Sequence, residues 1–167
     1  MSAVVEGGRT LLVILMGSPA DRDHAAKVAA TAARFGLTVE TRIGSAHKTP
    51  RHVLEIIDHY EADPRPKVWV TIAGRSNALS AFVDAAVSAP VIACPPLAMA
   101  EDLWSSVRMP ADVAPLVVLD PSNAALAAAK ILAQHDGAIA TRLAQYRAEQ
   151  FGSVVRADAD HHDGMAG

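Results

Sequence analysis

Two spacings of apolar residues alternate along the chain, and they predict alternating strands and helices. Residues 9–16 (RTLLVILM) form a continuous apolar run, which is typical of a strand buried on both faces. Residues 19–35 are rich in alanine, carry acidic residues in their first turn and end before Gly36, so they predict a helix. Residues 37–43 (LTVETRI) alternate between apolar and polar positions and predict a second strand.

The same alternation continues through the middle of the chain. Thr49 is placed to cap a helix that has Pro50 at its first position. Strands that alternate with helices predict a parallel sheet with helices on both faces. We therefore expect an α/β fold, a three-layer sandwich with a five-stranded parallel sheet of flavodoxin-like or Rossmann-like kind. The further predicted strands span 67–73, 90–94 and 116–119, and the further helices span 50–61, 77–88 and 100–107, with a long alanine-rich helix opening at 120–122.

The last part of the chain predicts one more helix and then a tail. Ile139, Leu143 and Tyr146 recur at helical spacing, which indicates an amphipathic helix that packs on the core or on a neighbouring subunit. Residues 152–167 have little apolar content and predict a disordered C-terminal tail. This leaves residues 1–151 as a single α/β domain.

The amino-acid composition indicates that the protein forms contacts between subunits. The chain has 167 residues, of which 51% are hydrophobic and only 20% charged. No apolar run approaches the ~20 residues that a membrane helix needs, so we expect no membrane association. Apolar surface that a monomer would have to keep polar is better explained by burial between subunits. We therefore expect a homo-oligomer, a tetramer or an octamer.

Charge and cysteine content exclude several other classes. The formal net charge of −3 provides no basic surface for nucleic acid. Residues 1–8 lack the positive start and apolar core of a signal peptide, and Cys94, as the single cysteine, cannot form an intrachain disulfide. These features predict a cytoplasmic enzyme or binding protein.

Small and polar residues gather where the predicted strands end. In open parallel sheets, ligands bind outside the carboxyl ends of the strands, so these residues are expected on one rim. The segments are GSPAD (17–21), GSAHK (44–48), AGRSN (73–77) and CPP (94–96). The rim is therefore the expected site, and it holds a histidine and two cations.

These rim residues match the needs of a mononucleotide. Ser18, Ser45 and Lys48 can hold a phosphate near helix N-termini, and Asp21 can accept hydrogen bonds from ribose hydroxyls. None of the loops matches a dinucleotide fingerprint or a phosphate-binding P-loop. His47 is the candidate acid or base, because an unperturbed histidine has a pKa of about 6.5.

Each of these residues also has a plainer interpretation. Ser18 and Asp21 can simply cap the first helix, and Ser45, Lys48 and His47 can be ordinary loop residues. Arg75 can pair with a carboxylate of another subunit. Cys94 is expected to be a buried strand-end residue rather than a nucleophile, and His24 and His135 are expected to face solvent.

Five short motifs, taken together, resemble one family. Each motif alone is weak, but their order and their positions at strand ends are specific. From about residue 11 to about residue 132, the chain is similar to the PurE family of purine biosynthesis. The motifs are LMGSPAD, SAHKTP, AGRSNAL, CPPL and DLWSSVRMP.

The resemblance extends to one branch of that family. Lys48 and the run Arg75-Ser76-Asn77 look like class II, phosphoribosylaminoimidazole carboxylase, which adds CO2 to aminoimidazole ribonucleotide (AIR). The resemblance implies that His47 transfers the proton and that no cofactor or metal is needed. It also implies that Ser45 and Lys48 bind phosphate, with Lys48 alternatively placing CO2, and that Asp21 holds the ribose. Gly74, Arg75 and Ser76 are then expected to position the base and the nascent carboxylate.

The chain departs from the family pattern at Ala20, Ala78 and Ser80, which puts fine substrate contacts in doubt. Three alternatives remain open from the sequence. They are the class I mutase, which isomerises N5-carboxyaminoimidazole ribonucleotide, a related carboxylase of a pyridinium mononucleotide, and a non-catalytic nucleotide-binding module.

Overall fold

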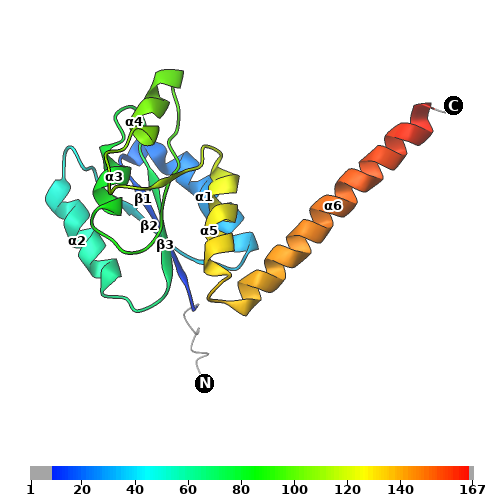
Figure 1. Ribbon diagram of the computed structural model, residues 1–167, viewed down its shortest axis with the longest axis horizontal. Helices are drawn as coiled ribbons and strands as arrows, with labels where there is room; N and C mark the ends of the chain where they lie inside the picture. Colours follow the sequence, from blue (N-terminus) through cyan, green and yellow to red (C-terminus); the bar gives the residue numbers. More distant parts are fainter. Residues whose placement is uncertain (1–8, 166–167) are drawn as a thin grey trace.

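A single twisted sheet forms the centre of the computed structural model, which describes residues 9–165 (Figure 1). All of its strand pairs are parallel, and the strands lie in the order β2-β1-β3-β4-β5. This is the flavodoxin-like order of a doubly wound sheet, so the predicted α/β sandwich with five parallel strands is confirmed. The strands are β1 (Leu11–Met16), β2 (Thr38–Ile43), β3 (Lys67–Ile72), β4 (Val91–Ala93) and β5 (Leu116–Val117).

Helices cover both faces of the sheet. Helices α1 and α5 pack together on one face, whereas α2 and α3 lie on the other (Figure 1). The helices are α1 (Arg22–Arg34), α2 (Pro50–Glu61), α3 (Ala78–Asp84), α4 (Trp104–Val107), α5 (Pro121–Leu132) and α6 (Gly137–Met165), with short 3-10 helices η1 (Pro19–Asp21) and η2 (Ala100–Leu103).

Strand β1 shows why a continuous apolar run suits the middle of this sheet. Leu12, Ile14 and Met16 face the core beneath α1 and α5, whereas alternate residues such as Leu11 and Val13 face the core beneath α2. Because side chains alternate between the two faces of a strand, a strand with helices on both sides must be apolar at every position.

Most differences from the predicted elements lie at their ends. The helix expected over 19–35 begins as η1 and becomes α-helical at Arg22. Helix α3 ends at Asp84 rather than continuing to Ser88, and the Asp84 carboxylate accepts a hydrogen bond of 2.7 Å from the Ala114 amide. Strand β5 is two residues long, because pairing with β4 covers only Leu116 and Val117.

The prediction of a disordered tail from residue 152 differs from the structure, in which α6 is helical to Met165. Ile139 and Leu143 are buried in the core, which anchors the first turns of this helix. Once a helix has nucleated, each added residue forms one more backbone hydrogen bond, and no proline interrupts the segment. The outer part of α6 projects away from the domain and leaves Phe151 74% exposed (Figure 1).

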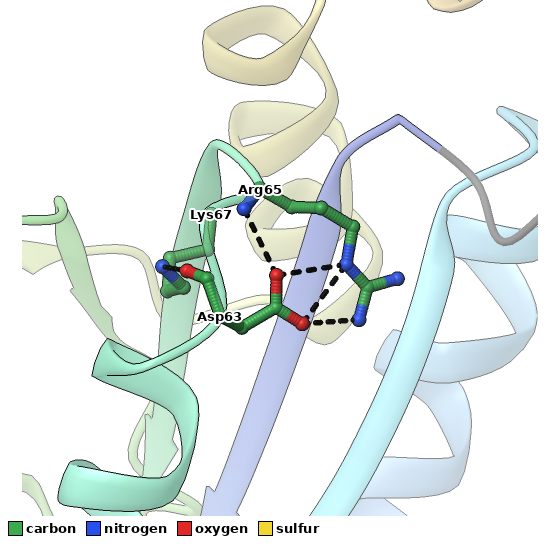
Figure 2. Close-up of polar contacts among 3 residues, drawn as sticks. All are labelled: Asp63, Arg65 and Lys67. Carbon is green, nitrogen blue, oxygen red and sulfur yellow. Dashed lines mark hydrogen bonds and ion pairs between the residues drawn. The ribbon is translucent and has the colours of Figure 1, made fainter.

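A tight ionic turn precedes β3 at the end of the sheet where the strands begin (Figure 2). The Asp63 carboxylate accepts two hydrogen bonds from the Arg65 Nε atom at 3.0 Å, one from Nη2 at 2.6 Å and one from the Arg65 amide at 2.9 Å. Lys67 Nζ donates to the Asp63 carbonyl at 2.8 Å. These bonds connect the end of α2 to the first residue of β3.

None of the helices within residues 9–165 combines the length and the apolar character that crossing a bilayer requires.

Candidate active site

A cavity of about 660 Å³ lies at the carboxyl ends of the strands, where the sequence analysis expected a site. Loops that follow β1, β2, β3 and β4 all contribute to it. The predicted site residues all line this one cavity: Ser18, Asp21, Ser45, His47, Lys48, Gly74, Arg75 and Ser76.

The loop after β1 supplies Ser18 and Asp21. The Ser18 hydroxyl accepts a hydrogen bond of 3.2 Å from the Ala20 amide, so it caps η1 as well as lining the cavity. Asp21 is half-buried, and this partial burial raises the pKa of its carboxyl, against the lowering effects of the Ser18 backbone contact and of His24. A carboxylate here offers acceptors to hydroxyl groups of a ligand.

The loop after β2 folds back on itself and presents two side chains. The Ser45 hydroxyl accepts from the Lys48 amide at 3.2 Å, and Thr49 Oγ1 accepts from the Ser45 amide at 3.0 Å. These bonds leave His47 and Lys48 exposed at the cavity wall. Thr49 occupies the N-cap position of α2 as predicted, but its hydroxyl bonds to Ser45 and makes no capping hydrogen bond to the helix.

The loop after β3 approaches the loop after β4 closely. A Cβ atom on Gly74 would lie 3.1 Å from the Pro96 carbonyl oxygen, so glycine permits this approach. The next residue, Arg75, has a φ of 55°, in the left-handed region that residues other than glycine rarely adopt. The two loops therefore form one continuous wall of the cavity.

Asn77 lies behind this wall rather than in it. Its side chain is 2% exposed, accepts from the Ser80 amide and hydroxyl at 3.1 and 2.9 Å, and donates to Ser106 Oγ at 3.0 Å. Of the run Arg75-Ser76-Asn77, the first two residues line the cavity and the third anchors them.

Cys94 and His24 form a contact outside the cavity lining. Cys94 is buried at the end of β4, as predicted, and burial together with Asp120 raises the pKa of its thiol to about 12. The prediction that His24 faces solvent is wrong, because this residue is half-buried with its Nε2 atom 3.3 Å from Cys94 Sγ. Burial, assisted by the charge of Lys27, lowers the pKa of His24.

Sequence reasoning missed one charged residue of the cavity, Asp102. Its carboxylate lies 3.3 Å from the amides of Ala98 and Met99 and accepts from both. The segment DLWSSVRMP carried the family resemblance without a role for this carboxylate. The motif therefore contained Asp102, but the sequence did not show that the loop after β4 brings this residue to the cavity.

The combination of groups suits acid-base chemistry on a small anionic ligand. The cavity volume is in the range of sites for mononucleotide-sized molecules. Lys48 and Arg75 can form charge-assisted hydrogen bonds to phosphate or carboxylate oxygens. The exposed imidazole of His47 can take up and return a proton near neutral pH.

Comparison with known proteins shows which family the chain resembles. The family model described as AIR carboxylase matches residues 11–152. The chain is 46% identical over 154 residues to a phosphoribosylaminoimidazole carboxylase of Treponema denticola, with 90% of this chain and 97% of that protein covered. It is 48% identical over 151 residues to a protein of the same name from Archaeoglobus fulgidus, with 89% and 83% covered.

A solved structure agrees with the sequence matches. The crystal structure of Treponema denticola PurE superposes on this chain with a TM-score of 0.89 and 45% sequence identity. The match covers 90% of this chain and 98% of that one.

Proposed function

Because the chain belongs to the AIR carboxylase family, an enzyme family, we propose that it joins CO2 directly to AIR as a class II enzyme. The observation that supports this proposal is that one cavity is lined by His47 and Lys48 together with Arg75 and Ser76. These residues come from two loops that are far apart in the sequence, and Lys48 and the arginine loop carry the class II pattern.

The reaction needs one proton transfer at carbon. The imidazole carbon C4 of AIR, next to the amino group, attacks CO2 and forms the new carbon–carbon bond, which leaves a tetrahedral carbon that still carries its hydrogen. His47 removes that proton, the electron pair returns to the ring, and aromaticity is restored. The protonated side chain of His47 then releases this proton to water. The reaction therefore consumes AIR and CO2 and yields carboxy-AIR and a proton. The same steps run in reverse, and none requires ATP or a redox cofactor.

The remaining cavity residues hold the substrate. The Ser45 hydroxyl accepts from the Lys48 amide, so its own hydrogen is free to be donated to a phosphate oxygen. Ser18 and Lys48 add further contacts to the phosphate, and Asp21 accepts from the ribose hydroxyls. Lys48 alternatively helps to place CO2.

The loop after β3 handles the carboxylate that forms. Gly74, Arg75 and Ser76 line the cavity wall, and a guanidinium group matches the geometry of a carboxylate. This loop also carries the argument for class II, since a carboxylase must admit CO2 from solvent, whereas a mutase must retain CO2 released from its own substrate.

The decisive experiment offers purified enzyme either AIR with CO2 or N5-carboxyaminoimidazole ribonucleotide, and follows the absorbance of carboxy-AIR. We expect efficient turnover of AIR with CO2. Efficient use of the N5-carboxylated compound, with AIR and CO2 used poorly, would reassign the chain to class I. Binding of AIR without turnover of either substrate would favour a non-catalytic module.

We also propose that the enzyme works as a homo-oligomer, a tetramer or an octamer, in the cytoplasm. Exposed apolar side chains support subunit contacts: Phe151, Val154 and Trp104 are 74%, 70% and 62% exposed. A cytoplasmic location fits a chain whose single cysteine is a buried free thiol.

A further inference from the structure

The segment formed by η2 and α4 contacts the loop after β3 through two hydroxyl groups, and that of Ser105 bonds to the loop backbone, whereas that of Ser106 bonds to the Asn77 side chain. Ser105 Oγ donates to the Arg75 carbonyl oxygen at 2.6 Å and accepts from the Asn77 amide at 2.9 Å. Its hydrogen also lies within reach of the Asp102 carbonyl at 3.0 Å, but the Arg75 contact is shorter. The two short bonds bracket the cavity residue Ser76, and the first of them fixes the carbonyl group of Arg75.

The backbone at Arg75, whose carbonyl accepts the first of these bonds, is strained. Arg75 adopts a φ of 55°, which an L-residue with a side chain keeps only where its surroundings enforce it. Without such contacts, the loop is expected to relax toward extended or right-handed conformations. The Arg75 carbonyl and the Asn77 amide would then turn, and the cavity wall between them would change shape.

Buried polar groups connect this point to the sheet. The Thr71 and Ser80 hydroxyls lie 2.7 Å apart, and both residues are 0% exposed. Ser80 donates to Asn77 Oδ1 at 2.9 Å, and the Asn77 amide donates to Ser105. The loop is therefore fixed from β3 on one side and from α4 on the other.

The same segment also holds the neighbouring loop. Asp102, one helical turn before Ser105, accepts from the amides of Ala98 and Met99. Residues 100–107 thus connect the two loops that form the cavity wall around Gly74 and Pro96.

We propose that Ser105 is a positioning residue for CO2 and the nascent carboxylate, because it holds Arg75 in the left-handed conformation. The inference rests on the proposed carboxylation of AIR and deepens it. The proposed phosphate and ribose contacts come from the loops after β1 and β2, whereas the hydrogen bonds of Ser105 go to Arg75, Asn77 and Asp102. Loss of the hydroxyl should therefore affect the use of CO2 much more than the binding of AIR.

The test compares Ser105→Ala with Ser105→Thr, which retains a hydroxyl. A protein whose competent conformation is only fractionally populated has its apparent affinity reduced by that fraction. We expect the KM for CO2 to rise about tenfold in Ser105→Ala, with the KM for AIR within about twofold of the original and with recovery in Ser105→Thr. A loss of folded protein would lower the apparent kcat but would leave both KM values unchanged.

Hydrogen exchange provides a readout that does not depend on turnover. The amides of residues 75–77 should exchange faster in Ser105→Ala than in the original chain, whether or not AIR proves to be the substrate. The matched control is Ser122→Ala, which removes an exposed hydroxyl that accepts from Thr31 Oγ1 at 3.3 Å, outside the cavity.

Three outcomes would overturn the inference. The first is unchanged exchange at 75–77 in Ser105→Ala, and the second is faster exchange with an unchanged KM for CO2. The third is an equal rise of the KM for CO2 in Ser122→Ala. If the original chain does not carboxylate AIR, the proposed function fails, whereas the exchange measurement still decides whether Ser105 holds the loop.

Discussion

The Nε2 atom of His24 lies 3.3 Å from the Sγ atom of Cys94, which joins helix α1 to the end of strand β4. The imidazole faces Lys27 and Asp21 on its own side and Asp120 at the start of α5. Burial outweighs the two carboxylates, so the pKa of His24 is lowered and the ring is neutral in the folded protein at neutral pH.

This contact predicts a loss of stability in mild acid. The unfolded chain protonates His24 near its ordinary pKa of 6.5, whereas the folded protein takes up this proton only at lower pH. The contribution of His24 is therefore complete above pH 6.5 and decreases as the pH falls toward the folded-state pKa. Urea unfolding at pH 7.5 and 5.5 should show a smaller decrease for His24→Gln than for the original chain. The exposed His135, changed to Gln, serves as the control and should retain the original decrease.

His47→Asn should remove most turnover while AIR still binds. Proton transfer by one placed side chain contributes typically ~10²–10⁴-fold to a rate, and the phosphate and ribose contacts of the proposed site come from other residues. Initial rates with AIR and CO2, together with calorimetric titration of AIR, measure the two effects. The matched control is His52→Asn on α2, where the ring is paired with Glu55 at 3.4 Å outside the cavity. Near-normal turnover of His47→Asn would assign the base to another group or to bound water.

Asp63→Asn should destabilise the protein without changing turnover, since this turn lies at the opposite end of the sheet from the cavity. Hydrogen bonds from Arg65 lower the pKa of Asp63 to about 2, below its ordinary value of 3.8. The stabilisation is complete above pH 4 and is lost as the pH falls toward 2. We expect a decrease of about 1 kcal/mol in the free energy of unfolding at pH 7, because solvent screens this pair. Chemical denaturation of Asp63→Asn measures this loss, and the exposed Asp58 changed to Asn should leave stability nearly unchanged.

The proposed assembly predicts a mass of four or eight chains in solution. Light scattering at micromolar concentration measures this directly, and a monomeric mass would contradict the proposal. Phe151→Ser and Val154→Ser on the projecting part of α6 should shift the distribution toward smaller species if this helix forms a subunit contact, because both side chains are largely exposed in one chain.

The architecture is largely predictable from the sequence, because buried parallel strands and amphipathic helices have different apolar spacings. The end of α3 could not be predicted in this way, because the Asp84 carboxylate accepts a hydrogen bond from the Ala114 amide, thirty residues away. The outer part of α6 was also missed. Low apolar content argues against a packed core, but it does not prevent a helix anchored by Ile139 and Leu143 from continuing.

The candidate site is predictable for a different reason. Parallel strands bring their carboxyl ends to one edge, so Ser18, Ser45, His47 and Arg75 could be grouped without knowing the strand order. The roles of Asn77 and Ser105 could not be assigned, because their hydrogen bonds depend on how α4 meets the loop after β3.

Strand β1 leaves the ribosome before any of its partners, although it ends at the centre of the sheet between β2 and β3. Until residue 72 has been synthesised, one edge of the segment LLVILM has no strand to pair with, and such uncharged apolar segments readily pair with other chains. In the folded protein the six residues are between 0% and 5% exposed. This apolar segment is therefore open to pairing with other chains during synthesis, and the completed sheet removes that exposure.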